Sequence, residues 1–305
     1  MRIVFMGTPE FAVPSLHKLA TSCHNVVAVV TAPDKAKGRG RKMAFPEVKE
    51  AAIELGLPVF QPESLRDKDF QNAMRELEAD VFIVVAFRIL PPSLYSIPRW
   101  GAINAHGSLL PKYRGAAPIH WAVYHGETET GITTFKIDKS VDTGSLLLKK
   151  KLAISKEDTS GSLYERMKDL AAEALLETID GLESESLKAM PQDENLVTKA
   201  PKIFPEMGEL DFKRSSEELV NHIRAFQPFP SCWFMLGENK VKIHKATFLP
   251  DSYGKVAELT LPDKKTLHIH CGQGILVPEI LQLPGRKALD MVAFLNGFNI
   301  KAYLG

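Results

Sequence analysis

Long apolar runs, cysteine pairs and a signal peptide are all missing from this 305-residue sequence. No stretch approaches the roughly 18 consecutive apolar residues of a membrane-spanning helix, and the opening MRIVFMGTPEF is too short in apolar residues to direct secretion. The three cysteines, Cys23, Cys232 and Cys271, lie far apart and form no CxxC pair, which argues against a disulfide framework and a zinc site. These absences predict a soluble cytoplasmic protein with no metal and no membrane partner.

An excess of charge of one sign is also missing, since 38 Lys and Arg residues face 37 Asp and Glu residues. Any binding to nucleic acid must therefore depend on a local patch of positive charge. The turn after the first apolar run reads Met-Gly-Thr-Pro, and no G-x-G-x-x-G, P-loop, HExxH or G-x-S-x-G motif occurs. These gaps disfavour a dinucleotide oxidoreductase, an NTPase, a zinc protease and an esterase.

The first half of the sequence alternates short β-branched runs with amphipathic stretches, an order typical of a parallel sheet covered by helices on both faces. Strands are expected at 2–6, 26–31, 81–86, 101–105 and 131–137. Helices are expected around 9–21, 46–55, 67–78 and 159–183. The pattern predicts a Rossmann-like, doubly wound α/β domain over residues 1–189.

A change of character near residue 190 predicts a second domain. Residues 190–206 contain several prolines and little periodicity, which indicates a linker. Residues 207–305 carry many short alternating runs, which favour a small, OB-like β-barrel. The expected elements are helices at 215–226 and 288–296 and strands at 240–249, 256–261, 266–271 and 275–281.

The segment INAHGSLLPKYRGAAPIHW (103–121) is the strongest candidate for chemistry. Asn104 and His106 stand two apart at the end of an apolar strand, so their side chains point to the same side. An amide and an imidazole together can donate hydrogen bonds to an oxyanion. Asp138 and Asp142 lie in a later turn, from which a carboxylate can orient His106 and stabilise its charged form. The alternative to a catalytic role is that Asn104 only ends the strand, that His106 is a buried core histidine, and that both aspartates are ordinary turn residues.

The pattern N-x-H-x-SLLPxxRGxxP, followed by D-T-G about thirty residues later, resembles the folate-dependent formyltransferases. The resemblance implies the formyltransferase fold, no metal, and 10-formyltetrahydrofolate as co-substrate. It also implies that the catalytic residues are Asn104, His106 and Asp142. The folate-binding residues that it implies are Ser108, Leu109, Leu110, Pro111, Phe87, Ile89 and Val141. The stretch AFRILP (86–91) departs from the family's usual A-Y-G-L-I-L-P, which is one residue longer and contains a glycine.

A basic loop distinguishes among the branches of this family. The segment TAPDKAKGRGRKMAFPEVK (31–49) resembles an insertion in the members that formylate methionyl-initiator tRNA. The resemblance implies that residues 207–305 form a tRNA-binding domain and that the loop also contacts tRNA. The tRNA-binding residues expected in the loop are Lys35, Lys37, Arg39, Arg41 and Lys42. The alternative is that these basic residues form a charged, solvent-exposed stretch that binds no tRNA.

Three other functions share parts of this pattern. A nucleotide-sugar formyltransferase has the same catalytic trio but lacks the basic loop. A 10-formyltetrahydrofolate hydrolase uses water as the nucleophile, and a non-catalytic RNA-binding protein needs none of the three side chains. The sequence favours the tRNA-formylating branch, with methionyl-initiator tRNA and folate as partners, no stable protein partner and a monomeric state.

Overall fold

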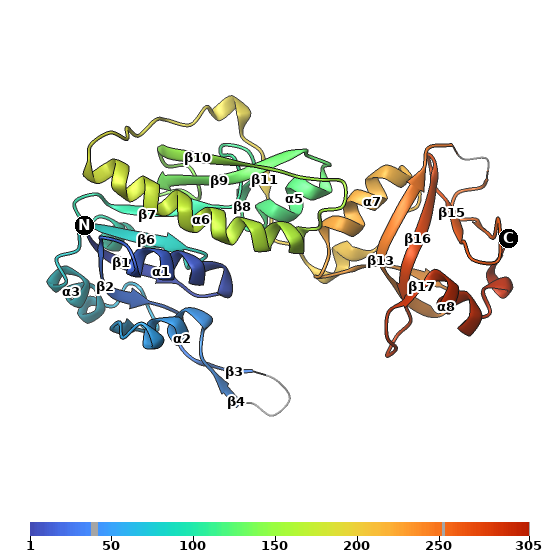
Figure 1. The fold of residues 1–305 in the computed structure, drawn as a ribbon, viewed down its shortest axis with the longest axis horizontal. Helices are drawn as coiled ribbons and strands as arrows, with labels where there is room; N and C mark the ends of the chain where they lie inside the picture. The colour runs from blue at the N-terminus through green and yellow to red at the C-terminus, as the bar shows by residue number, and fades with distance from the viewer. Residues whose placement is uncertain (38–41, 252–253, 305) are drawn as a thin grey trace. The chain divides into compact units, whose positions relative to one another are not determined.

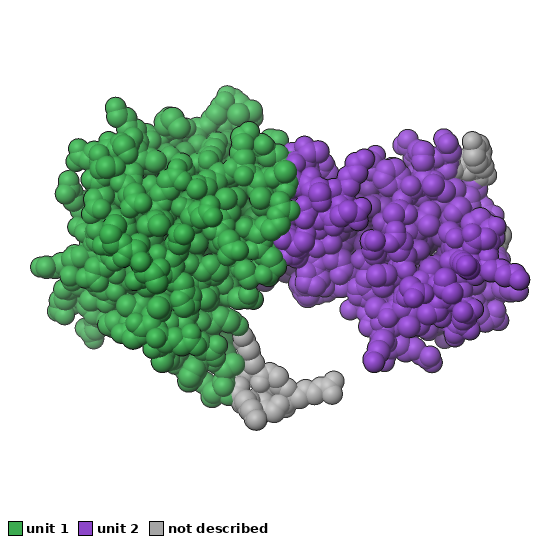
Figure 2. Space-filling model, in the orientation of Figure 1, with its two compact units in different colours: residues 1–115, 129–153, 164–200 green, residues 116–128, 154–163, 201–305 purple. Residues whose placement is uncertain are grey.

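Two units make up the computed structural model, which describes residues 1–37, 42–251 and 254–304 (Figures 1 and 2). The units are not simple successive halves of the chain. The first unit contains residues 1–115, 129–153 and 164–200. The second unit contains residues 116–128, 154–163 and 201–305. The chain therefore passes between the units several times.

A seven-stranded sheet organises the first unit, in the order β10-β9-β7-β6-β1-β2-β5. Five of its strands run parallel: β1 (Arg2–Gly7), β2 (Asn25–Val30), β5 (Val59–Phe60), β6 (Val81–Val85) and β7 (Ala102–His106). The sequence analysis expected four of them but not β5, whose two residues give no periodicity. The strand order reverses between β1 and β6. This reversal confirms the doubly wound α/β fold, whose ligands bind near such a switch point.

Two antiparallel strands at one edge make the sheet mixed rather than wholly parallel. β9 (Glu129–Lys136) runs antiparallel to β7, and β10 (Leu146–Ala153) runs antiparallel to β9. The sequence analysis gave bounds for β9 but none for β10, whose LLLKKKLA sequence lacks clear alternation at its start. Lys150 of β10 pairs with two carboxylates of helix α6 (Ser160–Glu183), those of Glu173 and Glu177. A lysine can therefore occupy a strand that a helix covers.

Helices cover both faces of this sheet. Alternate strand residues such as Val4 and Met6 pack in one cluster with Phe70 of α3 (Lys68–Glu76) and Leu94 of α4 (Pro92–Tyr95). The other face is covered by α6, where Thr178 hydrogen-bonds Thr134 of β9 at 2.7 Å. The remaining helices of this unit are η1 (Glu10–Ala12), α1 (Val13–Ala20), α2 (Glu47–Glu54) and η2 (Glu194–Leu196).

Two short strand pairs complete the first unit. β3 (Lys35–Lys37) and β4 (Lys42–Ala44) form an antiparallel hairpin inside the basic loop. β8 (Arg114–Gly115) pairs in parallel with β11 (Lys199–Ala200), which belongs to the segment interpreted from sequence as a linker. Both pairs were missed by the sequence analysis, because runs of two or three residues give no periodicity.

An antiparallel sheet organises the second unit, in the order β12-β13-β16-β15-β14, with β17 beside β16. Its strands are β12 (Cys232–Leu236), β13 (Asn239–Leu249), β14 (Leu259–Thr260), β15 (His268–His270), β16 (Ile275–Gln282) and β17 (Leu289–Asp290). The helices of this unit are α5 (Pro118–Tyr124), η3 (Pro205–Gly208), α7 (Ser216–Ala225), α8 (Met291–Gly297) and η4 (Ile300–Tyr303). The antiparallel C-terminal domain is thus confirmed, although within residues 201–251 and 254–304 its hydrogen-bonded path stays open and forms no closed barrel.

Within the described parts of the chain, the structure contains no helix that is both long and apolar enough to cross a membrane.

Candidate active site

Two polar side chains emerge from β7 on one side of the sheet. Asn104 is half-buried between Val84 of β6 and Phe135 of β9, and His106 is 6% exposed. Their spacing of two residues on a strand places both side chains on the same face. Within the described residues the Asn104 side chain makes no hydrogen bond, which leaves its amide free to donate to a ligand.

The imidazole of His106 is held on both sides. Its Nε2 lies 2.8 Å from the carbonyl oxygen of Tyr113, and since a carbonyl can only accept, Nε2 carries a proton and donates it. Its Nδ1 lies 3.6 Å from Oδ2 of Asp142, and the same oxygen accepts a 2.9 Å hydrogen bond from the backbone N–H of Gly115. A second proton, on Nδ1, would therefore face a carboxylate. Donation to a substrate oxygen needs that second proton or release of the Tyr113 bond.

The turn between β9 and β10 delivers Asp142 to this ring. Because β9 is antiparallel to β7, the turn begins beside the amino end of β7, where the Ile137 N–H bonds the carbonyl of Ala102. The turn then folds back, with Asp142 in the left-handed region at φ 56°. Gly144 is required two residues later because a Cβ there would collide with the carbonyl oxygen of Lys136. The D-T-G sequence is thus explained by backbone geometry as well as by chemistry.

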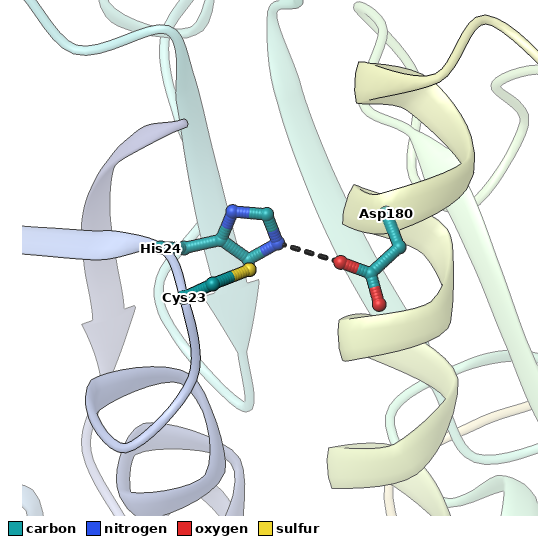
Figure 3. Close-up of side chains that lie close together, drawn as sticks. All are labelled: Cys23, His24 and Asp180. Carbon is teal, nitrogen blue, oxygen red and sulfur yellow. Dashed lines mark hydrogen bonds and ion pairs between the residues drawn. The ribbon is translucent and has the colours of Figure 1, made fainter.

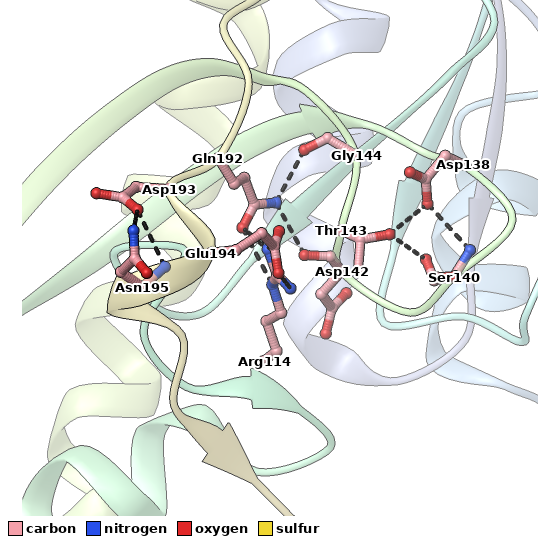
Figure 4. A network of polar contacts seen from close by, with 10 residues as sticks. All are labelled: Arg114, Asp138, Ser140, Asp142, Thr143, Gly144, Gln192, Asp193, Glu194 and Asn195. Carbon is pink, nitrogen blue, oxygen red and sulfur yellow. Dashed lines mark hydrogen bonds and ion pairs between the residues drawn. The ribbon is translucent and has the colours of Figure 1, made fainter.

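Asp138 has a structural place in the same turn. Its Oδ1 accepts hydrogen bonds from the backbone N–H of Ser140 at 3.0 Å and from the Thr143 hydroxyl at 2.7 Å (Figure 4). These bonds match the interpretation of Asp138 as an ordinary turn aspartate.

The side chains of the loop after β7 are largely used to hold the loop itself. The Ser108 hydroxyl donates to the Lys112 carbonyl at 2.6 Å, and the Thr133 hydroxyl bridges the backbone of Ser108 and Leu110. Leu110 is fully buried in a cluster with Phe135 and Leu146, and Pro111 is also buried. Leu109 is half-buried. A ligand can meet this loop through its backbone and through Leu109 more readily than through the other side chains.

Exposed apolar side chains accompany the site in the first unit. Ile89, in the loop after β6, is 80% exposed, and Val141, next to Asp142, is 55% exposed. Phe87 packs partly against the core. Both side chains lie on loops, where binding residues are frequent, so these two positions are candidates for contact with a flat ring.

The basic loop contains a hairpin, and hydrogen bonds hold the base of that hairpin in place. Lys35 is exposed on β3, and the backbones of Lys37 and Lys42 pair across the hairpin. At the base, Asp34 accepts hydrogen bonds from Gln61 at 2.7 Å and Lys49 at 2.6 Å, and these bonds lower the pKa of its carboxyl. Two of the predicted tRNA-binding residues, Arg39 and Arg41, lie outside the described residues.

One group of metal-ligating side chains lies away from this site. Among the described residues, only Cys23, His24 and Asp180 form a group of three or more whose potential ligand atoms all lie within 4.8 Å of one another (Figure 3). His24 Nδ1 lies 3.1 Å from the Met1 amine, and Nε2 lies 2.9 Å from Asp180 Oδ1. An ammonium can only donate and a carboxylate can only accept, so both ring nitrogens are already satisfied. Glu183 also pairs with the Met1 amine at 2.8 Å, and the cluster fastens the start of β1 to α6.

Two residues that the sequence analysis did not single out support the Asp142 turn, Gln192 directly and Arg114 through Gln192. Gln192 donates hydrogen bonds to the backbone carbonyls of Asp142 and Gly144, and Arg114 contacts Gln192 and Glu194 (Figure 4). Arg114 is part of the RG pair in the SLLPKYRG motif, so a signal for it was present. Gln192 lies in an aperiodic segment and gave no signal.

Comparison with known families agrees with this arrangement. The profile of the family described as formyl transferase matches residues 1–179, and the profile described as formyl transferase, C-terminal domain, matches residues 202–299. The chain belongs to the formyl transferase family. Its predicted catalytic residues all lie in the region that the first profile matches.

Relatives of similar length exist in several bacteria. A methionyl-tRNA formyltransferase of Lachnospira eligens is 41% identical over 99% of this chain and 98% of its own length. A methionyl-tRNA formyltransferase of Geobacter metallireducens is 42% identical over 99% and 97%. The similarity spans both units.

Solved structures of formyltransferases share the fold at much lower identity. A sugar 3N-formyl transferase superposes with a TM-score of 0.68 at 18% identity, over 94% of this chain and 99% of its own. An N-formyltransferase of Helicobacter canadensis, in complex with folinic acid and dTDP-3-aminofucose, gives a TM-score of 0.69 at 20% identity, over 90% and 97%. These structures support the fold of the family, but they do not indicate which molecule receives the formyl group in this protein.

Proposed function

We propose that this protein transfers the formyl group of 10-formyltetrahydrofolate to the amino group of methionyl-initiator tRNA, giving N-formylmethionyl-tRNA for translation initiation. The observation that carries the proposal is identity of about two residues in five, over nearly the whole chain, to relatives named methionyl-tRNA formyltransferase. An enzyme that modifies aminoacyl-tRNA works where translation occurs, so we propose a cytoplasmic location, and we also propose that it acts as a monomer.

Asn104, His106 and Asp142 are proposed to act on the tetrahedral intermediate of this transfer. The methionyl amine attacks the formyl carbon, a new carbon–nitrogen bond forms, and the carbonyl oxygen becomes an oxyanion. The free amide of Asn104 donates to that oxyanion, as does His106 once its Nδ1 is protonated beside Asp142. A preorganised donor of this kind contributes about 3–4 kcal/mol. The intermediate collapses when the bond to the folate nitrogen breaks and that nitrogen takes up the proton lost by the amine, carried through a water relay.

The folate is proposed to lie between the loop after β7 and the exposed apolar side chains. The backbone of Ser108, Leu109, Leu110 and Pro111 would line the site, because the side chains of Ser108 and Leu110 already hold the loop. The pterin ring would lie against the segments that carry Phe87, Ile89 and Val141. Covering Ile89 and Val141 would remove two exposed aliphatic groups from water.

The tRNA is proposed to contact the basic loop with Lys35, Lys37, Arg39, Arg41 and Lys42. The net charge of +1 supplies no general attraction for a polyanion, so affinity must come from a local concentration of cations. Arginine suits this role because its planar group binds phosphate through two hydrogen bonds or stacks on a base. Each phosphate engaged releases counterions, so binding should weaken with salt by a log–log slope of about one per contact.

One assay tests the proposal directly. The protein is incubated with 10-formyltetrahydrofolate and either methionyl-initiator tRNA, a nucleotide sugar with a free amine, or no acceptor, and formyl transfer is followed. Transfer to the tRNA is expected, and a faster reaction with the sugar, or hydrolysis without any acceptor, would assign a different branch of the family. Arg39→Ala should raise the KM for tRNA and leave folate binding unchanged, whereas Lys18→Ala on α1 serves as a surface control.

A further inference from the structure

We propose that Gln192 is a positioning residue that acts through Asp142, and that Gln192 and Thr198, within a segment interpreted from sequence as a linker, support the active site. The inference rests on the proposed function of Asp142 as the partner of His106. It concerns a segment that contributes no group to the chemistry itself.

Gln192 fixes the backbone on both sides of the turn that carries Asp142. Its Nε2 donates one hydrogen bond to the Asp142 carbonyl at 2.9 Å and another to the Gly144 carbonyl at 2.8 Å (Figure 4). Asp142 occupies the left-handed region, which a residue with a Cβ adopts only where its surroundings hold it. Both protons of one amide are therefore used to hold this conformation.

Arg114 determines which way the Gln192 amide faces. Its Nε and Nη2 both contact Gln192 Oε1, at 3.1 and 2.8 Å, and since a guanidinium can only donate, the oxygen of the amide must face Arg114. The NH2 group is thereby directed at the turn. Arg114 also bonds both carboxylate oxygens of Glu194, at 3.1 and 2.7 Å, and these hydrogen bonds lower the pKa of the Glu194 carboxyl. Glu194 thus anchors Arg114 from the same segment.

The same segment holds the other neighbour of His106. The Thr198 hydroxyl accepts the Tyr113 N–H at 2.8 Å, and the Thr198 carbonyl accepts the Arg114 N–H at 2.9 Å. Tyr113 supplies the carbonyl that receives the Nε2 proton of His106. Residues 190–200 therefore hold the acceptor on each side of the imidazole, one through Gln192 and the other through Thr198.

The length of the Asp142 contact explains why this support matters. Asp142 Oδ2 lies 3.6 Å from Nδ1 of His106, a separation that a small shift of the turn can shorten or lengthen. A misplacement of about 1 Å in a catalytic geometry can lower the rate roughly a hundredfold. Release of the turn should change turnover without removing any group that binds substrate.

The test uses Gln192→Leu, Gln192→Glu and the control Asn195→Ala in the full-length protein. Gln192→Leu removes both donors, and Gln192→Glu keeps the size and the Arg114 contact but turns a carboxylate oxygen toward the two carbonyls. Asn195 lies in the same segment, where its side chain bonds only Asp193 within the described residues. Both Gln192 variants should lower kcat about 10- to 100-fold with little change in either KM, while Asn195→Ala stays normal.

A double-mutant cycle with Asp142→Asn separates positioning from general damage. If Gln192 acts through the Asp142 carboxylate, Gln192→Leu causes no further loss of kcat in the Asp142→Asn background. Equal loss in both backgrounds, or normal kcat in both Gln192 variants, would overturn the proposal. Should Gln192→Leu fail to fold, Gln192→Glu completes the same cycle. The wild-type protein reports on the proposed function in the same assay, so inactivity of the wild type with methionyl-initiator tRNA is a separate outcome.

Discussion

Two buried histidines, one in each unit, share a local arrangement and differ in what they can do. His106 is 6% exposed and His222 is 4% exposed, and each places Nε2 2.8 Å from a backbone carbonyl oxygen, that of Tyr113 or that of Met207. In both rings Nε2 therefore carries the proton. The difference lies at the second nitrogen, Nδ1.

The surroundings of Nδ1 separate a chemical role from a structural one. Nδ1 of His106 faces the Asp142 carboxylate, whereas Nδ1 of His222 is buried and has no hydrogen-bond partner within the described residues. The His222 ring packs edge-on against Tyr124 and Phe226, with ring centres 5.0 and 4.5 Å away. Burial lowers the pKa of His222 to about 4, so this ring stays neutral. The carboxylate at Nδ1 makes His106 a candidate for catalysis, whereas His222 is held as a neutral ring in the core.

The largest difference between the two histidines is expected in the effect of their substitution on kcat. His106→Ala should lower kcat about a hundredfold or more, because an oxyanion donor is lost. His222→Gln keeps a donor for the Met207 carbonyl and should leave kcat unchanged. Steady-state kinetics of formyl transfer provides the comparison. Near-normal turnover in His106→Ala would contradict a catalytic role of His106.

The free energy of unfolding should depend more strongly on His222 than on His106. His222→Ala leaves a cavity between two aromatic rings and an unpaired Met207 carbonyl, and it should lower the free energy of unfolding by about 3 kcal/mol. Urea denaturation, followed by tryptophan fluorescence, to which Trp121 and Trp233 of the same unit contribute, measures this loss. His222→Gln is the matched control, since it retains the bond to Met207 and should lose less. An unchanged urea midpoint in His222→Ala would contradict a structural role.

The pH dependence of unfolding should show a smaller effect of His222. Its pKa is about 4 in the folded protein and about 6.5 in an unfolded chain, so the unfolded state binds more protons between these values. The stabilisation is complete above pH 6.5 and is lost as the pH falls, by about 2 kcal/mol at pH 5. Carboxyls titrate in the same range, so the wild-type curve is compared with that of His222→Gln. Parallel curves from pH 7 to 4 would mean that His222 is not buried in its neutral form.

Sequence periodicity was sufficient for most of the first unit. β1, β2 and β6 lie within about one residue of their predicted ends, because strands buried on both faces are continuously apolar. The common side of Asn104 and His106 follows from the same geometry, since residues two apart on a strand share a face. The motif around them identified the family before any contact was known.

Periodicity failed where tertiary contacts override local pattern. β10 begins with three leucines and continues with three lysines, of which Lys150 pairs with two carboxylates of α6 and Lys151 with Glu129 of β9. β12 (Cys232–Leu236) was missed because a proline-rich stretch precedes it. Residues 190–206 have the composition of a linker, yet Gln192 and Thr198 within them make hydrogen bonds around the Asp142 turn and Tyr113.

The sequence by itself determined the alternation of strands and helices, the family, and the candidate residues on β7. These properties depend on the chemistry of neighbouring residues, which the order of amino acids records directly. Tertiary structure alone decided that Asp142 reaches His106 from the turn after an antiparallel strand, that Nδ1 of His222 has no hydrogen-bond partner among the described residues, and that Gln192 holds the turn. These contacts join residues between 15 and 50 positions apart in the chain, or they depend on which groups are kept away by burial. A local sequence pattern records neither property.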